Sequence, residues 1–145
     1  MAAQMERAKK LIAEKGPAAL LEMMGDANRE PDMPQITEED IENSDTEIAV
    51  YVLARNSGEG KDHKAEAGDY ELSAIERQNL DVISKAYVKT IVVLNVGGVI
   101  DTKVIRGTEG VGAVLLMSQA GNISGYALAD ILTGKAVPSG HLTTT

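Results

Sequence analysis

Apolar and polar positions follow two different periods along this chain. Three short apolar runs predict strands at residues 47–54, 90–96 and 112–117. The first is nearly continuously apolar and partly β-branched, as expected of a strand covered on both faces, and the second is also predicted to be buried. Between them, residues 73–87 carry apolar side chains at roughly helical spacing, and residues 124–132 predict a last helix. Strands that alternate with helices indicate a parallel sheet with right-handed connections.

Local signals mark where the predicted helices begin and end. Ser73 and Glu76 form a capping box, in which each side chain can accept a hydrogen bond from the other residue's backbone N–H. Thr37 precedes three acidic residues and predicts the N-cap of a short helix. Residues 101–105 predict a further helical turn, and Gly134 predicts the end of the last helix.

The first part of the chain has a different composition. Helices are predicted at residues 2–15 and 18–24, and a polar, proline-containing connection follows them. We therefore expect a helical lead or insert over residues 1–45 that packs on an α/β domain over residues 46–145. The expected fold is a three-layer α/β/α sandwich of flavodoxin-like type with a mostly parallel sheet. Because three strands make a small sheet, we expect at least one further strand before residue 1.

Composition narrows the possible functions. The 145 residues include 43% hydrophobic and 25% charged residues, which is typical of one globular domain. A net charge of −8 argues against nucleic-acid binding, and no apolar run approaches the ~20 residues of a membrane span. Cysteine is absent and the two histidines, His63 and His141, are isolated, so we expect no metal site and no cofactor. The N-terminus lacks the apolar core of a signal peptide, and a cytoplasmic location is expected.

The predicted strands end in small and polar residues. The three loops at residues 55–60, 95–98 and 118–121 should lie side by side, at the edge where open parallel sheets bind ligands. Together they offer one acid, several amides and two hydroxyls, a set that suits ligands rich in hydroxyl groups, such as sugars. These side chains are Glu59, Asn56, Asn95, Gln119, Ser57 and Ser118.

Taken alone, each of these elements also has a simple structural interpretation. Glu59 stands between two glycines directly after a strand, which is a position for chemistry, but a Gly-Glu-Gly loop is often a solvated turn. Residues 97–98 are typical of a tight turn. They could also cradle a phosphate, but this interpretation is weak because the full glycine fingerprint and a following helix with a lysine are missing. Asp62 and Asp69, in the same long loop, have the pattern of solvated acids.

Several motifs in order resemble one known family. Most of residues 44–142 resembles the α/β sandwich domain of family 3 glycoside hydrolases, the β-glucosidase group. In that family the domain forms part of an (α/β)6 sandwich. The matching segments include Arg55-Asn56-Ser57-Gly58-Glu59-Gly60, Gly68-Asp69-Tyr70-Glu71-Leu72-Ser73, Leu94-Asn95-Val96-Gly97-Gly98, Gln119-Ala120-Gly121 and Pro138-Ser139-Gly140-His141-Leu142. The leading helices resemble an insert seen in some bacterial members.

The resemblance implies a division of labour between two domains. In this family a TIM-like barrel carries the aspartate nucleophile, and the sandwich domain contributes the general acid/base, which here corresponds to Glu59. The implied substrate is a β-glucoside or an oligosaccharide, and the implied partner is the barrel of the same enzyme. Further candidates for contact with substrate or with the barrel are Arg55, Asn56, Ser57, Asp62, His63, Asn95 and Gln119.

The chain also departs from the family pattern. No segment resembles the barrel or its Ser-Asp-Trp nucleophile motif, so the chain alone is expected to be inactive. His63 stands where an arginine is usual, and residues 122–124 replace the usual Gln-Glu-Gly. A non-catalytic sugar-binding or interaction module with the same fold is the alternative, and a flavodoxin-like nucleotide binder is the weaker third. An incomplete sheet should expose an unpaired edge and apolar surface, so self-association of the chain is expected.

Overall fold

The computed structural model describes residues 33–56 and 63–142, together with positions 13 and 16. The chain divides into two compact units, residues 1–32 and 33–145, and the second contains every element discussed below. The predicted helix at 18–24 lies outside the described residues, as does the predicted helix at 2–15 except for Ala13, which is helical. Ser57, Glu59 and Asp62 also lie outside them.

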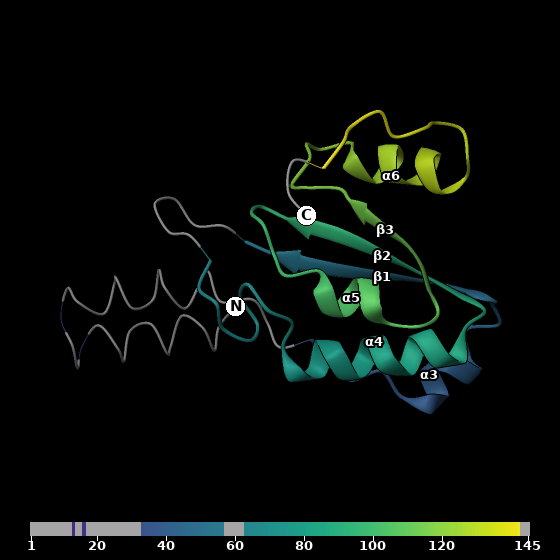
Figure 1. Cartoon of the computed structure of the whole chain (residues 1–145), viewed down its shortest axis with the longest axis horizontal. Helices are drawn as coiled ribbons and strands as arrows, with labels where there is room; N and C mark the ends of the chain where they lie inside the picture. Colours follow the sequence, from purple (N-terminus) through teal and green to yellow (C-terminus); the bar gives the residue numbers. More distant parts are fainter. Residues whose placement is uncertain (1–12, 14–15, 17–32, 57–62, 143–145) are drawn as a thin grey trace. The chain divides into compact units, whose positions relative to one another are not determined.

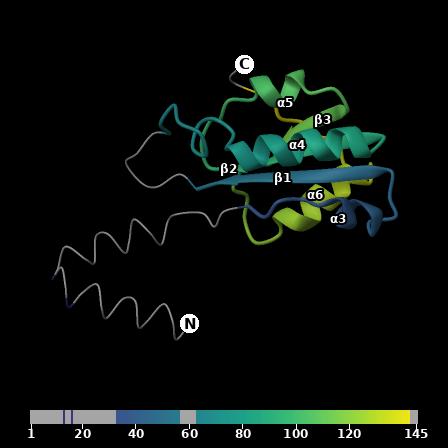
Figure 2. The same cartoon turned by 90° about the horizontal axis from the view of Figure 1, so that it is seen from below.

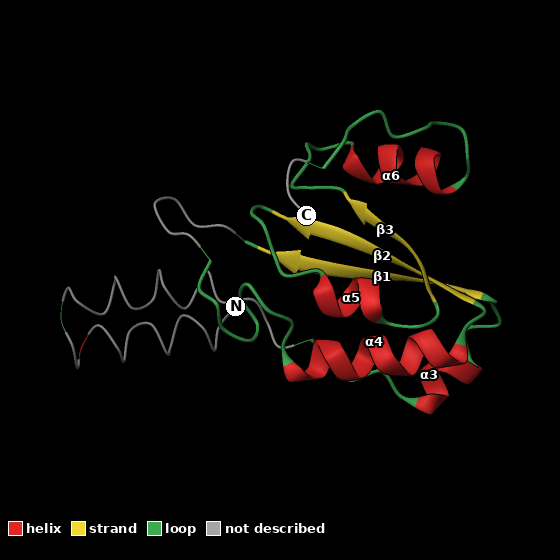
Figure 3. Ribbon diagram, in the orientation of Figure 1, coloured by secondary structure: helices red, strands yellow, loops and turns green. Residues whose placement is uncertain are grey.

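Strands and helices alternate along the second unit (Figures 1 and 3). The sequence predicted each strand to within one residue and predicted the last helix with its observed bounds. The elements are α3 (Glu38–Glu42), β1 (Ile48–Arg55), α4 (Ala74–Ala86), β2 (Lys89–Val96), α5 (Lys103–Gly107), β3 (Val111–Leu116) and α6 (Ser124–Leu132).

The three strands form a parallel sheet in the order β1-β2-β3, which confirms the predicted strand direction. Helices α4 and α5 lie on one side of this sheet and α6 on the other (Figure 2), so the predicted α/β/α layering is also confirmed. The main core lies between the sheet and the α4–α5 layer. Its buried side chains include Tyr51, Leu53, Leu80, Ile83, Val92, Leu94, Val96 and Ile105.

The other face of β1 differs from the prediction. We expected a strand covered on both faces, but burial alternates along β1, and Ile48, Val50 and Val52 are 51%, 45% and 41% exposed. The reason is that successive side chains of a strand point to opposite faces, and this set points away from the α4 layer. Among the described residues, nothing covers this side of β1 fully, and these three side chains remain accessible to solvent.

The predicted helix caps are present. Ser73 and Glu76 satisfy each other's backbone N–H groups at the start of α4, and Thr37 and Asp40 do the same at the start of α3. Gly134, just after α6, has φ of 75°, the left-handed conformation that glycine adopts most easily. These caps fix the beginning of α4, which matters because Glu76 lies in its first turn.

A buried amide joins the segment before β1 to α4. The Asn79 side chain is fully buried; its Oδ1 accepts a hydrogen bond from the Ile36 N–H at 2.9 Å, and its Nδ2 donates to the Pro34 carbonyl at 2.9 Å. Met33 and Ile36 pack against the core. Residues 33–45, which were predicted to belong to the helical lead, therefore pack with the strands in this unit.

Candidate functional site at the carboxyl edge of the sheet

The ends of all three strands are joined by hydrogen bonds. The Arg55 carbonyl, at the end of β1, accepts from the Gly97 N–H at 3.1 Å and from Gln119 Nε2 at 3.2 Å. Gln119 Nε2 also donates to Asn56 Oδ1 at 3.2 Å. The predicted meeting of the three strand ends at one edge is therefore observed, and Gln119 is the residue that spans from β3 to β1.

The Arg55 side chain points into the protein interior and pairs with Glu76. Two hydrogen bonds of 2.6 Å join the guanidinium to the carboxylate, from Nη1 to Oε1 and from Nη2 to Oε2. Both side chains are only 6% exposed. Arg55 Nη1 also donates to the Ala54 carbonyl at 2.7 Å, and Arg55 Nε donates to the Asp69 carbonyl at 3.0 Å. Arg55 was predicted as a loop contact, and in this structure its charged group anchors the end of β1 to the first turn of α4.

The pKa of Glu76 reflects this pairing. Burial alone would raise the pKa of the Glu76 carboxyl, but the hydrogen bonds from Arg55 and from the Ser73 backbone outweigh it and hold the pKa below its ordinary value. Glu76 is therefore ionised in the folded protein at neutral pH. The sequence showed Glu76 as a capping residue only, and its second role carries no local signal.

His63 pairs with Asp69 at the same edge. The imidazole Nδ1 contacts Asp69 Oδ1, and Asp69 Oδ2 accepts from the Lys64 N–H at 2.9 Å. This backbone hydrogen bond and the His63 contact lower the pKa of Asp69, so its carboxylate stays charged. Asp69 was expected to be a solvated acid. Its side chain is instead 38% exposed, and its carboxylate contacts His63 and the backbone of Lys64.

The other edge of the His63 ring lies against the turn after β2. A Cβ placed on Gly98 would be 2.8 Å from His63 Nε2 and 2.9 Å from Cδ2, so only a glycine leaves room for the ring in this position. The Nε2 atom is buried and has no hydrogen-bond partner among the described residues. His63 thus extends from Asp69 to the end of β2.

A cavity of about 580 Å³ opens beside these strand ends. Apolar side chains from β2 and β3, among them Leu94 and Leu116, form part of its wall. Polar groups gather on its lining, as is usual in sites for small ligands: Tyr70, Asp101, Thr102, Arg106, Ser118 and Gln119. Asn95 is not among the lining residues, because its neighbours Leu94 and Val96 point into the main core and Asn95 points to the opposite face.

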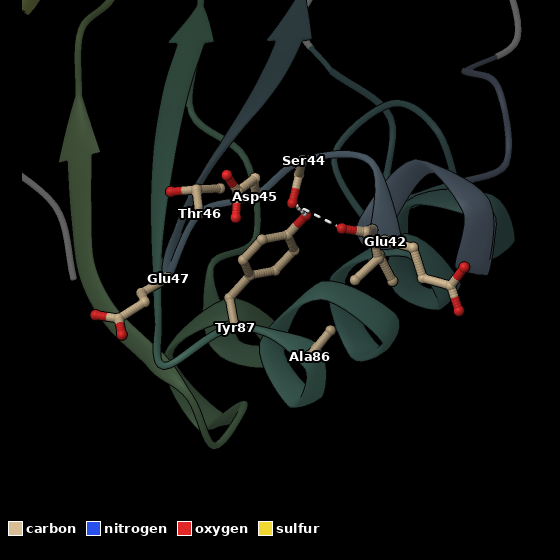
Figure 4. A pocket seen from close by; sticks show the side chains of 8 residues that line it. Glu42, Ser44, Asp45, Thr46, Glu47, Ala86 and Tyr87 are labelled. Carbon is tan, nitrogen blue, oxygen red and sulfur yellow. Dashed lines mark hydrogen bonds between the residues drawn. The ribbon is translucent and has the colours of Figure 1, made fainter.

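A second cavity, of about 300 Å³, lies at the amino end of the sheet (Figure 4). Tyr87 points toward Ser44, and its hydroxyl donates to Ser44 Oγ at 2.8 Å. Acidic side chains of Glu42, Asp45 and Glu47 line it. Ligands of open parallel sheets bind at the carboxyl end of the strands, so the first cavity is the better candidate.

Within residues 33–56 and 63–142, no group of three or more histidine, aspartate or glutamate side chains is placed to hold a metal ion. No helix in the same ranges is long and apolar enough to cross a membrane.

Comparison with known proteins decides the family. The model of the glycosyl hydrolase family 3 C-terminal domain matches residues 5–145. The chain belongs to this family. Among curated relatives, β-glucosidase A of Butyrivibrio fibrisolvens is 31% identical over 140 residues, which cover 81% of this chain and 17% of the relative. The exo-1,4-β-xylosidase of Emericella nidulans is 40% identical over 85 residues, or 57% of this chain and 11% of the relative.

Solved structures show the same fold. A β-glucosidase from Paenibacillus barengoltzii superposes with a TM-score of 0.71 at 32% identity, over 75% of this chain and 12% of that one. β-Glucosidase 3B of Thermotoga neapolitana, solved in complex with glucose, gives 0.62 at 34% identity over 74% of this chain and 16% of the other. This family 3 domain therefore spans less than a fifth of the length of the relatives it matches.

Proposed function

We propose that this chain is the acid/base-bearing domain of a retaining glycoside hydrolase that removes terminal β-linked glucosyl residues. The proposed general acid/base is Glu59, and the proposed partner is a barrel domain that carries the nucleophile. The observation that supports this role is the set of hydrogen bonds that gathers Arg55, Gly97 and Gln119 at one edge of the sheet. Glu59 follows the first of these strand ends by four residues in the sequence.

The chemistry explains why one carboxyl group is not enough. A retaining glycosidase uses two, about 5–5.5 Å apart: one forms a covalent glycosyl intermediate, and the other protonates the leaving oxygen and then activates water. A strand-end loop of the sandwich domain is suited to the second role, because it can face a barrel that holds the sugar. The amides of Asn56 and Gln119, which already hydrogen-bond to each other, are the candidate contacts for sugar hydroxyls.

The substitution Glu59→Gln in the complete enzyme tests this role. The amide cannot donate a proton to the leaving group, so we expect the turnover of alkyl β-glucosides, which have poor leaving groups, to fall by about 10²- to 10⁴-fold. The first step on activated aryl β-glucosides, such as a dinitrophenyl glucoside, should be much less affected. The matched control is Glu66→Gln, at an exposed glutamate seven residues further along the chain. Equal losses in the first step on both substrates, or no loss in that step on either, would remove Glu59 from the acid/base role.

The 145-residue chain itself offers a second test. With one of the two carboxyl groups missing, it should not hydrolyse aryl β-glucosides at any pH. Turnover by the purified chain that Glu59→Gln abolishes would contradict the proposed division between two domains. If the complete enzyme also lacks turnover but glucose shifts the NMR signals of the Asn56 and Gln119 side-chain amides, the non-catalytic sugar-binding module becomes the better description.

A further inference from the structure

The apolar surface of the core continues from β2 onto β3. Val92 and Leu94 of β2 lie in the buried core, and the strand register places Val114 and Leu116 of β3 beside them. Paired residues of neighbouring strands point to the same face, so both β3 side chains point to the side of α4 and α5. They are 39% and 43% exposed, whereas Val92 and Leu94 are 0% and 5% exposed. In the described part of the chain, the apolar surface therefore extends beyond the area that the two helices cover.

This uncovered area forms the floor of the larger cavity. Leu94, Val96 and Ile100, each at most 5% exposed, contribute its inner part, and Val114 and Leu116 contribute its outer part. The turn after β2 and the beginning of α5 also line it. A volume of about 580 Å³ lies within the range of about 300–1,000 Å³ that is usual for small-molecule sites. The cavity can therefore surround the apolar body of a small ligand.

Gln119 presents a hydrogen-bond acceptor at one edge of this cavity. Its Nε2 donates to the Arg55 carbonyl at 3.2 Å and to Asn56 Oδ1 at 3.2 Å. Both amide hydrogens are thus used within the protein, and the Oε1 atom accepts no hydrogen bond from the described residues. A ligand that meets this atom has to supply a donor, such as a hydroxyl group.

Ser118, the next lining residue, has an unfavourable backbone conformation. Its φ is 56°, in the left-handed region that residues with a side chain rarely adopt. The Met117 and Ser118 N–H groups both donate to the Leu94 carbonyl, at 3.0 and 3.2 Å, and so hold this turn at the end of β3. Residues in such conformations cluster at sites that hold ligands. The Ser118 hydroxyl has no hydrogen-bond partner among the described residues and adds a second polar group at the cavity.

The charges on the cavity lining balance. Asp101 and Arg106 are its charged residues, one of each sign. The Asp101 carboxylate accepts from the Lys103 N–H at 2.8 Å, and the Arg106 side chain forms no ion pair with the described residues. The whole chain carries a net charge of −8, which does not favour an anion. A neutral ligand matches this lining best.

We propose that this cavity binds neutral, mainly apolar alcohols. The alkyl or aryl body lies over Leu94, Val114 and Leu116, and the hydroxyl group donates a hydrogen bond to Gln119 Oε1. The proposal goes beyond the hydrolysis proposed above and does not depend on it, because the cavity is formed by this chain alone.

Titration of the 145-residue chain with 1-hexanol, followed by the NMR signals of the methyl groups, tests the site. We expect saturable shifts at Leu94, Val114 and Leu116. The dissociation constant should fall about fourfold for each methylene group added between 1-butanol and 1-hexanol. The exposed apolar row of β1 is an internal control, because Ile48 and Val50 belong to no described cavity. Shifts of equal size in that row, or shifts that do not saturate, would overturn the proposal.

Two further ligands test the polar end. Hexyl methyl ether has a similar apolar body but no donor, so it should bind about 2- to 10-fold more weakly than 1-hexanol. Gln119→Leu should remove this difference. Hexanoate should bind no better than 1-hexanol. Equal affinities for the ether and the alcohol in the parent chain would contradict the role of Gln119, and tighter binding of hexanoate that Arg106→Gln abolishes would show an anion site instead.

A substitution that fills the cavity tests its location. Val114→Trp places a large side chain over the floor, and we expect the affinity for 1-hexanol to fall at least 10-fold. The matched control is Val88→Trp, at a valine that is 72% exposed and lines neither cavity. Thermal midpoints show whether both variants fold. Equal affinities of the two folded variants would overturn the assignment, and if Val114→Trp does not fold, the pattern of methyl shifts in the parent chain decides it.

Discussion

The guanidinium of Arg55 and the carboxylate of Glu76 form a two-point ion pair inside this domain, with both hydrogen bonds at 2.6 Å and both side chains 6% exposed. Burial of two charges is costly, and their attraction repays it only when the geometry is good and the other donors are satisfied. Here Arg55 Nε and Nη1 also donate to backbone carbonyls, and Glu76 also accepts from the Ser73 N–H at 2.7 Å. The pair therefore couples the strand end that leads to Glu59 with the first turn of α4.

Removal of one partner of this pair should destabilise the domain strongly. Glu76→Gln leaves the buried Arg55 charge without a counter-charge, and such changes cost about 3–5 kcal/mol. An internal control lies on the same helix: Asp81→Asn breaks the exposed pair with Lys85, whose side chains are 59% and 72% exposed, and should cost less than about 0.5 kcal/mol. Urea unfolding of the three proteins measures both values. Similar losses of unfolding free energy for the two substitutions would show that the buried pair stabilises the domain no more than the exposed one.

The same pair predicts how stability depends on pH. Because the pKa of Glu76 is lower in the folded state than its ordinary value, its contribution is fully present above the ordinary carboxyl pKa and is lost as pH falls through the lowered one. Other lowered carboxyls, such as Asp69, act in the same direction. The difference in unfolding free energy between the parent chain and Glu76→Gln should therefore be constant from pH 6 to pH 8 and shrink below about pH 4. A difference that stays constant to pH 2.5 would contradict this linkage.

Features that depend on neighbouring residues in the sequence were the predictable part of this fold. The strands follow from apolar runs, and the start of α4 follows from Ser73 and Glu76, which lie three residues apart. The ion pair of Glu76 with Arg55 was not predicted, because the two residues are 21 positions apart and meet only through the packing of α4 on β1. The capping box and the ion pair use the same carboxylate, and only the first leaves a local pattern.

The candidate site shows the same division. The meeting of Arg55, Gly97 and Gln119 was predictable, because parallel strands place their carboxyl ends at one edge. The contacts of Asp69 were not predictable, because the sequence around an acid in a polar loop looks the same whether the acid is solvated or contacts two segments of the chain. The place of Glu59 among these groups stays a prediction from its sequence position and from the family motif.

Gly110, which precedes β3 in the sequence and packs against the backbone of α4, should not tolerate a side chain. Gly110 has φ of 89°, and a Cβ there would lie 2.2 Å from the Ser84 carbonyl oxygen, so the backbone would have to shift. We expect Gly110→Ala to lower the free energy of unfolding by at least about 1–3 kcal/mol. Gly107→Ala is the control, because Gly107 ends α5 with nothing within 4 Å of its Cβ position, and it should be neutral or slightly stabilising. Equal thermal midpoints for the two variants would contradict this assignment.

The outer strand β1 should make the 145-residue chain self-associate. Among the described residues β1 pairs only with β2, and Ile48, Val50 and Val52 expose an apolar row on one face of this outer strand. A second copy can bury the same row against itself, and we expect a mass that rises with concentration in light scattering. Val50→Lys places a charge in the row and should shift the chain to monomer, whereas Val88→Lys, at a valine that is 72% exposed outside the strands, should not. A strict monomer at high concentration, or equal effects of the two lysines, would show that this face is not where copies meet.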